Sequence, residues 1–182
     1  MFSQFYYLKS NIKKLREKLG RIVSPQNAEN WWKPDLFEKN TLHKLPPGLK
    51  VVTPPPVLEK NYNCFVYVLG LEKNSRFIGS KAWEHTRYLG DLFEKMIRQG
   101  YLQERPCASK NVLVLYRDSG GRISHVGVMK EDERVVSKWS LGPLLEHNIW
   151  SVPDHYGDDV SFWVIKEGAV DFVKRNLFRG LD

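Results

Sequence analysis

The chain has 182 residues, of which 42% are hydrophobic and 27% charged, and its net charge is +7 at pH 7. A chain of this length and composition can bury one hydrophobic core, and it contains no run of about eighteen apolar residues that would span a bilayer. The two cysteines, Cys64 and Cys107, are too few for a disulfide framework or a thiolate zinc site. We therefore expect free thiols and predict neither a metal nor a cofactor.

The beginning of the chain, residues 1–5, lacks the uninterrupted apolar stretch of a secretory signal, and we expect a cytoplasmic protein. A net positive charge is typical of nucleic-acid-binding proteins, because clustered lysines and arginines attract phosphates. Much of the charge here is confined to the N-terminal residues. Nucleic-acid binding is therefore the least favoured of the functions considered below.

Residues 1–21 are predicted to form a basic amphipathic helix. Leu8, Ile12, Leu15 and Leu19 recur at helical spacing, and lysines occupy much of the remaining surface. The favoured interpretation is that the apolar stripe docks on the main domain while the lysines face solvent. The alternative is an arm that binds a membrane surface or an acidic partner.

Residues 22–60 form a proline-rich segment that either wraps around the main domain or acts as a linker. Its repeated prolines interrupt both helices and strand ladders. Trp31, Trp32 and Phe37 indicate that part of the segment packs on the main domain, residues 61–182, because linkers seldom contain large aromatic residues.

Within the main domain the pattern of apolar residues predicts an α+β fold. A short helix begins at Cys64 behind the capping residues Asn61 and Asn63 and ends at Gly70, although its β-branched residues also suit a strand. Three later strands form an antiparallel meander, because short turns join them. The further expected elements, in chain order, are a helix His85–Gln99, the meander strands Val112–Tyr116, Ile123–Lys130 and Arg134–Trp139, a strand Val160–Ile165 and a helix Ala169–Arg179.

Two short segments contain the residue types of a thiol hydrolase. Cys64 is expected in the first helical turn, where unpaired backbone N–H groups favour a thiolate, the form that nucleophilic catalysis needs. His125 is expected on a strand, on the same face as Gly127, whose small size lets another group approach. Taken singly, each residue suits a structural role. Together, as nucleophile and base, they favour a cysteine hydrolase.

The segments Asn63-Cys64-Phe65-Val66 and His125-Val126-Gly127-Val128, in this order, resemble the NlpC-type papain-like superfamily of cell-wall peptidases and amidases. The likeness covers residues 61–164. Residues 135–147, followed by Tyr156-Gly157, resemble a less characterised bacterial branch of that superfamily. The resemblance implies a cysteine-bearing helix packed on an antiparallel sheet, and an activity against an amide or peptide bond, with peptidoglycan peptide as one candidate substrate.

The resemblance also implies roles for single residues. Cys64 would be the nucleophile, and His125 the base that deprotonates it and later protonates the leaving amine. The Cys64 backbone N–H would form part of an oxyanion hole, with Tyr62 and Asn63 in support.

The superfamily's third residue, which orients the histidine, lies on the following strand. In this chain that strand offers Ser137 or Lys138, where the superfamily usually has histidine, asparagine or glutamine. We prefer Ser137, because Lys138 and an imidazolium would both be cationic. His147, expected in the loop after residue 143, and its neighbour Glu146 are competing candidates.

The sequence therefore predicts a thiol hydrolase that acts on a peptide or amide substrate. The rival interpretation is a catalytically silent binding module on the same fold, whose basic N-terminal helix recruits an acidic partner. The third interpretation is a basic nucleic-acid-binding protein. A reactive thiolate would distinguish the hydrolase from the silent binding module. Salt-dependent binding of an oligonucleotide tests the nucleic-acid-binding interpretation.

Overall fold

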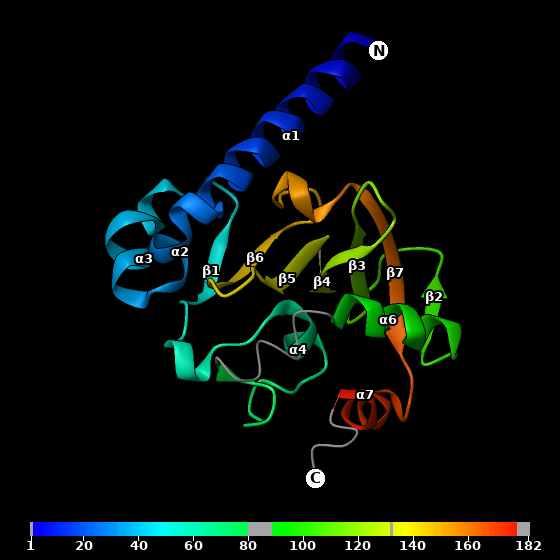
Figure 1. Ribbon diagram of the computed structural model, residues 1–182. Coiled ribbons are helices and arrows are strands. Elements are labelled where there is room, and N and C mark those ends of the chain that lie inside the picture. Colours follow the sequence, from blue (N-terminus) through cyan, green and yellow to red (C-terminus); the bar gives the residue numbers. More distant parts are fainter. Residues whose placement is uncertain (1, 80–88, 132, 178–182) are drawn as a thin grey trace.

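The computed structural model describes residues 2–79, 89–131 and 133–177, with side chains from Ser10 onward. These residues form an α+β fold, in which helices cover both faces of an antiparallel seven-stranded sheet of order β1-β6-β5-β4-β3-β7-β2 (Figure 1). The strands are β1 (Lys50–Thr53), β2 (Leu102–Arg105), β3 (Leu113–Arg117), β4 (Ile123–Met129), β5 (Arg134–Lys138), β6 (Leu144–Asn148) and β7 (Asp159–Ile165). The helices are α1 (Phe2–Ile22), α2 (Ala28–Trp32), α3 (Pro34–Asn40), α4 (Cys64–Val68), α6 (Leu89–Arg98) and α7 (Ala169–Leu177), with short 3₁₀ helices at Pro25–Asn27, Leu42–Lys44, Leu58–Lys60 and Asp154–Tyr156.

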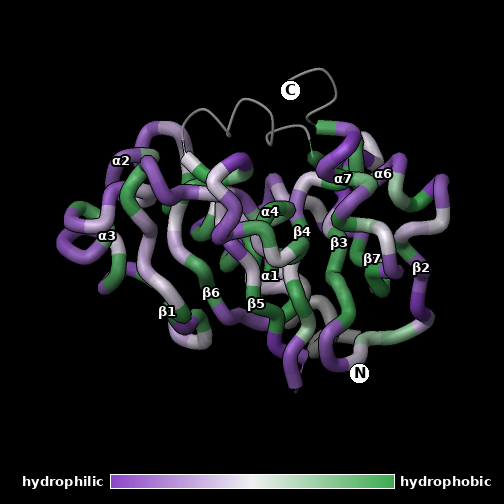
Figure 2. Tube along the Cα trace, turned by 90° about the horizontal axis from the view of Figure 1, so that it is seen from below, coloured by the Kyte–Doolittle hydropathy of each residue, from purple (hydrophilic) through white to green (hydrophobic). Residues whose placement is uncertain are grey.

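Alternate residues of the central strands supply two cores, one on each face of the sheet. Leu113 and Leu115 of β3 pack with residues of α4, α6 and α7 in what we call the α4-side core. Val114 and Tyr116 of the same strand pack with residues of α1, α2 and α3 in the α1-side core. Figure 2 shows β3 as hydrophobic along most of its length, as expected for a strand buried on both faces.

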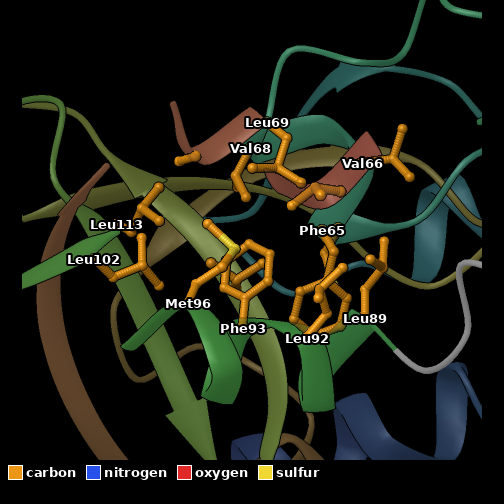
Figure 3. Packing of buried hydrophobic residues seen from close by; sticks show 14 of the residues in the cluster. Phe65, Val66, Val68, Leu69, Leu89, Leu92, Phe93, Met96, Leu102 and Leu113 are labelled. Atoms are coloured by element: carbon orange, nitrogen blue, oxygen red, sulfur yellow. The ribbon is translucent and has the colours of Figure 1, made fainter. Parts of the chain in front are cut away.

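The α4-side core holds helix α4 against the sheet. Helix α6 buries Leu89, Leu92, Phe93 and Met96, which recur at helical spacing. Their side chains point toward those of α4, and the ring of Phe65 meets that of Phe93 edge-on at a centroid distance of 5.0 Å (Figure 3). Because aromatic contacts of this kind tolerate little displacement, the packing fixes where α4 begins relative to the strands.

A bulge in β4 sets the direction of the His125 side chain. Tyr116 of β3 pairs with His125. The next pair along the ladder joins Arg117 to Ile123, so Ser124 is the extra residue. Ile123 therefore lies in the α4-side core, whereas His125, two positions later, contacts Tyr116 on the other face.

Residues 22–60 are built into the domain. Trp31 of α2 and Phe37 of α3 are buried, and the Trp31 indole Nε1–H donates to the Trp139 carbonyl oxygen at 3.0 Å. Strand β1 pairs with β6 and forms one edge of the sheet. A domain boundary at residue 61, as the sequence suggested, would therefore leave β1 outside the domain that contains the other six strands of its sheet. The prolines that follow β1 are compatible with a sheet edge, where no further strand needs their missing N–H groups.

Helix α1 docks on the α1-side core through its leucine stripe. Leu19 is fully buried and Leu15 partly buried, whereas Ile12 is 37% exposed. Arg16 is also buried, and its guanidinium donates to the Gly157 carbonyl oxygen at 2.6 Å. None of the helices in the described part of the chain combines the length and the apolar character that a membrane span requires.

Most of the predicted elements of the main domain are present. The three meander strands correspond to β3, β4 and β5, which are neighbours and antiparallel. The helix at Cys64 is confirmed but ends at Val68. Helices α6 and α7 match their predictions within the described residues, and residues 85–88, including His85, and 178–179 lie outside them. Strands β1, β2 and β6 and helices α2 and α3 were not predicted.

Candidate functional site

Cys64 is the first residue of helix α4. The side chain of Asn63 caps the helix by accepting a hydrogen bond from the Val66 backbone N–H at 3.0 Å. One residue earlier, the Asn61 side-chain oxygen accepts from the Tyr62 backbone N–H at 2.8 Å. The two asparagines thus fix the approach to Cys64, as the sequence predicted for the caps.

Cys64 is 5% exposed, and its thiol lies among groups with opposing effects on its pKa. Burial raises the pKa of Cys64 to about 12. Hydrogen bonds from the backbone N–H groups of Val126, Phe65 and Cys64 itself, and the charge of Lys138, act to lower the same pKa. Burial is the largest effect, so the thiol is protonated at neutral pH in this conformation.

Helix α4 packs against strands β4 and β5. The ladder between these strands contains Val128 paired with Val136 and Met129 paired with Val135. Toward the start of β4, the Val126 N–H donates to the Cys64 sulfur. The thiol therefore contacts the backbone of β4 immediately beside His125.

The His125 side chain lies on the α1 side of the sheet and forms a hydrogen-bonded chain with two other buried residues. Its Nε2 lies 2.9 Å from the Ser137 Oγ on β5. The same Oγ lies 2.8 Å from Nε2 of His147 on β6 and accepts a hydrogen bond from the Trp139 indole at 3.0 Å. The structure thus brings His125, Ser137 and His147 together, although the sequence placed Ser137 and His147 as alternatives.

The partners of this chain fix the position of each proton. The Nδ1 of His147 lies 2.8 Å from the Asn148 carbonyl oxygen, which can only accept, so Nδ1 bears the proton. Burial lowers the pKa of His147 to about 4, so the ring is neutral and its Nε2 accepts from the Ser137 hydroxyl. Ser137 has then donated its single proton, and Nε2 of His125 must donate to it. The Nδ1 of His125 keeps its lone pair.

The His125 ring is enclosed by aromatic residues. It stacks on Tyr156 at a centroid distance of 4.0 Å with 12° between the planes, and Tyr116 flanks it at 5.5 Å. Burial lowers the pKa of His125 well below its ordinary value, and the nearby His147 and His155 lower it further. His125 is therefore a neutral imidazole at neutral pH, with one nitrogen able to accept a proton.

Cys64 and His125 approach β4 from opposite sides. Cys64 belongs to the α4-side core, whereas His125 contacts Tyr156 of the α1-side core. Among the described residues, no hydrogen bond joins the Cys64 sulfur to the His125 ring. The expected nucleophile and base are thus neighbours along the backbone of β4, with no hydrogen bond between them among the described residues.

The remaining predicted residues have other surroundings. Lys138 faces away from His125, because it alternates with Ser137 along β5, and its Nζ donates to the Asn61 side-chain oxygen at 3.1 Å. Tyr62 is partly buried, with its ring centre 5.1 Å from the Lys138 Nζ. Glu146 also alternates away from His125 and pairs with Arg134 at 3.3 Å. These contacts remove Lys138 and Glu146 as orienting residues for His125.

His147 was expected in a loop, but it lies on β6. The physical reason is that Leu145 and His147 alternate into the α1-side core, which gives the segment the period of a strand. Tyr156 and Trp139 were not predicted to contact the site. Tyr156 comes from a short 3₁₀ helix far along the chain, and no local pattern indicates its stacking on His125. No group of three or more His, Cys, Asp or Glu residues suited to a metal occurs in the described ranges.

A family model described as "Domain of unknown function (DUF7689)" matches residues 57–164. The chain belongs to this family. The match spans Cys64, His125, Ser137 and His147, so both parts of the candidate site lie inside the DUF7689 region, whereas helices α1 to α3, strand β1 and helix α7 lie outside it. Searches of curated proteins and of solved structures gave no match.

Proposed function

We propose that the protein is a thiol hydrolase of amide or peptide bonds, with Cys64 as the nucleophile and His125 as the group that moves the proton. The supporting observation is the hydrogen-bonded chain from Asn148 to His125, which leaves the Nδ1 lone pair of His125 available. The thiol lies beside this residue, at the N–H of Val126. A cysteine-bearing helix packed on an antiparallel sheet is also what the sequence resemblance implies.

The reaction begins with transfer of the thiol proton from the Cys64 sulfur to Nδ1 of His125, which forms a thiolate and an imidazolium. This step requires the two atoms to come within hydrogen-bond distance, as catalytic pairs often do only when substrate is bound. The thiolate attacks the carbonyl carbon. Backbone N–H groups at the start of α4, with Tyr62 in support, stabilise the oxyanion.

The imidazolium then returns its proton to the leaving nitrogen, the C–N bond breaks, and a thioester remains on Cys64. A water molecule hydrolyses the thioester and regenerates the thiol. Ser137 holds the His125 ring through Nε2 during both steps, and the buried His147 keeps Ser137 in its donor orientation. Peptidoglycan peptide stays a candidate substrate on the strength of the sequence resemblance.

The second candidate is a catalytically silent binding module on the same fold. It is favoured by the burial of Cys64, by the pKa of Cys64 near 12 and by the lack, among the described residues, of a hydrogen bond between Cys64 and His125. In that case the two residues serve the packing of α4 and of the α1-side core.

A panel of dipeptidyl aminomethylcoumarin amides separates the two candidates. The hydrolase releases the fluorophore, Cys64→Ala abolishes release, and His125→Gln lowers it by about a hundredfold, the typical effect of losing a general base. Cys107→Ala is the matched control, because Cys107 is an exposed thiol remote in sequence from the site. Release that persists in Cys64→Ala, or equal inactivity of all four proteins, contradicts the proposal and favours the binding module.

A further inference from the structure

Lys138 is a fully buried lysine that the mechanism above does not use. It follows Ser137 on β5, so its side chain points to the α4 side of the sheet while Ser137 points to His125. Extending the β4–β5 register from Val128 and Val136 places Lys138 beside Val126, whose N–H contacts the Cys64 sulfur. A buried lysine is costly unless nearby groups stabilise its charge.

The partners of the Lys138 amine come from the segment that leads into α4. Its Nζ donates to the side-chain oxygen of Asn61 at 3.1 Å and to the Gly142 carbonyl oxygen, and it lies 5.1 Å from the centre of the Tyr62 ring. These contacts draw the amine toward the residues immediately before Cys64. In the described part of the chain, no carboxylate forms an ion pair with Lys138.

We infer that Lys138 is the charge partner of Cys64, and that its ammonium stabilises the thiolate on the α4 side of the sheet. The inference deepens the proposed function and rests on Cys64 being its nucleophile. Lys138 is a positioning residue in this scheme, because it acts on the reaction through the sulfur. His125, on the other side of β4, moves the proton to and from the substrate.

The Lys138 ammonium stabilises the thiolate without taking the thiol proton, which moves to Nδ1 of His125 as described above. Two hydrogen bonds occupy two of the three outer positions of the Lys138 nitrogen, and the third holds a proton when the amine is charged. When the S–H bond of Cys64 breaks and an N–H bond forms on His125, the new thiolate lies beside the ammonium, and the opposite charges of Cys64 and Lys138 offset each other in the low-dielectric site.

The pKa shifts of the neighbouring groups agree with this coupling. Burial lowers the pKa of Lys138 to about 7, and Cys64 raises it, while Lys138 lowers the pKa of Cys64. The other titratable groups that face the pair are Tyr62, whose pKa is raised by burial and then by Glu72, and Tyr156, whose pKa burial and Cys64 raise. Both tyrosines are therefore neutral over the range in which Lys138 titrates.

The test follows the ionisation of both groups by nuclear magnetic resonance, with isotope-labelled lysine Cε and cysteine Cβ, so that neither substrate nor access to the thiol is needed. The first comparison is Lys138 in wild type and in Cys64→Ser, which keeps the shape of the side chain and removes the thiol. The second comparison is Cys64 in wild type, Lys138→Met and Lys138→Arg. Lys130→Met, at an exposed lysine, is the matched control for losing one charge.

We expect the apparent pKa of Lys138 to fall by about one unit in Cys64→Ser, because an opposite charge at close range typically shifts a pKa by this amount or more. The apparent pKa of Cys64 should rise by about one unit in Lys138→Met, equal to about tenfold less thiolate, and should return toward wild type in Lys138→Arg. Lys130→Met should leave both titrations unchanged. Cys107 supplies an internal reference signal in every sample.

Unchanged titration of Lys138 in Cys64→Ser overturns the inference, even if Lys138→Met does not fold. The outcome is separate from that of the proposed function. If Cys64 and Lys138 titrate together but the protein cleaves no amide, the charge pair is supported and the proposed hydrolase function is contradicted. If the protein cleaves amides but the two groups titrate independently, the hydrolase function is supported and the role of Lys138 in it is contradicted.

Discussion

The Cys64 sulfur accepts a hydrogen bond from the backbone N–H of Val126, and this contact places the candidate nucleophile directly beside His125. It depends on the burial of α4 against the sheet. The helix thus delivers the thiol to one side of β4 while the imidazole occupies the other. Catalysis in this account requires a movement that brings Nδ1 of His125 to the sulfur.

Ser137 joins the two histidines and should matter more to stability than an ordinary buried serine. Ser137→Ala removes the partner of the Trp139 indole N–H, of the His125 Nε2–H and of the His147 Nε2 in one step. We expect a loss of about 2–4 kcal/mol in the free energy of unfolding, because each unpaired buried group costs about 1–3 kcal/mol. Urea unfolding of wild type and Ser137→Ala measures this loss of free energy.

The matched control is Ser161→Ala. Ser161 also accepts from a tryptophan indole, that of Trp163 at 2.8 Å, but it is only partly buried and has no histidine partner. We expect a loss of about 1 kcal/mol there. Equal losses in the two variants would show that the chain of hydrogen bonds through Ser137 adds nothing.

The buried histidines should make the protein less stable in acid. The pKa of His147 is about 4 in the folded protein, below its ordinary value of 6.5, because of burial, so the unfolded chain binds a proton between these two values. Stability is therefore fully present above about pH 6.5 and falls as the pH drops toward about 4, by on the order of 3 kcal/mol from His147 alone. His125 acts in the same direction.

Urea unfolding across that pH range, in wild type and in His147→Gln, measures this contribution. His147→Gln should flatten the acid-side fall, whereas His43→Gln, at an exposed histidine, should leave its slope as in wild type. An acid-side slope that is the same in His147→Gln and in wild type would show that His147 does not cause it.

Gly127 allows Ser137 to reach His125. A Cβ at Gly127 would lie 2.5 Å from Cγ1 of Val135 and 3.0 Å from Cβ of Ser137. Gly127→Ala should therefore cost about 1–3 kcal/mol of stability and lower any hydrolase activity, because neighbouring backbone must shift. Gly120→Ala, in an exposed turn, is the control and should change stability by less than about 1 kcal/mol. Equal stability of the two variants would contradict the close packing of β4 against β5 at Gly127.

Arg16 ties helix α1 to the segment that contains Tyr156. Its guanidinium donates to the Gly157 carbonyl oxygen, one residue from the ring that stacks on His125. Arg16→Met should lower the free energy of unfolding by about 1.5–3 kcal/mol, the usual worth of a hydrogen bond to a charged group, as measured by urea unfolding. Lys14→Met removes a charge from an exposed position of the same helix and should have little effect. Comparable losses of unfolding free energy in both variants would mean that α1 affects stability through its charge and not through the hydrogen bond of Arg16.

Local sequence patterns predicted the elements whose periodicity is strong. The continuous apolar run around Leu115 and the asparagine caps before Cys64 both led to the observed elements. Strands β1 and β2 form the two edges of the sheet and are largely exposed, so they lack the apolar pattern that marks a strand. The prolines after β1 further obscured it.

The site was predicted only in part, for a reason of geometry. Alternation along β4 and β5 correctly placed Ser137 on the same face of the sheet as His125. The register itself puts Ser137 opposite Gly127, because Val128 pairs with Val136, so Ser137 reaches His125 across the diagonal. The same alternation turns Lys138 toward Cys64, but the sequence could not show where α4 would pack. The side of the sheet on which Cys64 lies depends on tertiary packing alone.

The most direct test is to look for a covalent acyl group on Cys64 after brief exposure to p-nitrophenyl acetate, located by peptide mass spectrometry. The account predicts an acetyl thioester on Cys64 in wild type and its loss in His125→Gln, with the exposed Cys107 modified equally in both. Acetylation of Cys107 alone in both proteins, with Cys64 untouched, would contradict the claim that Cys64 is a nucleophile activated by His125.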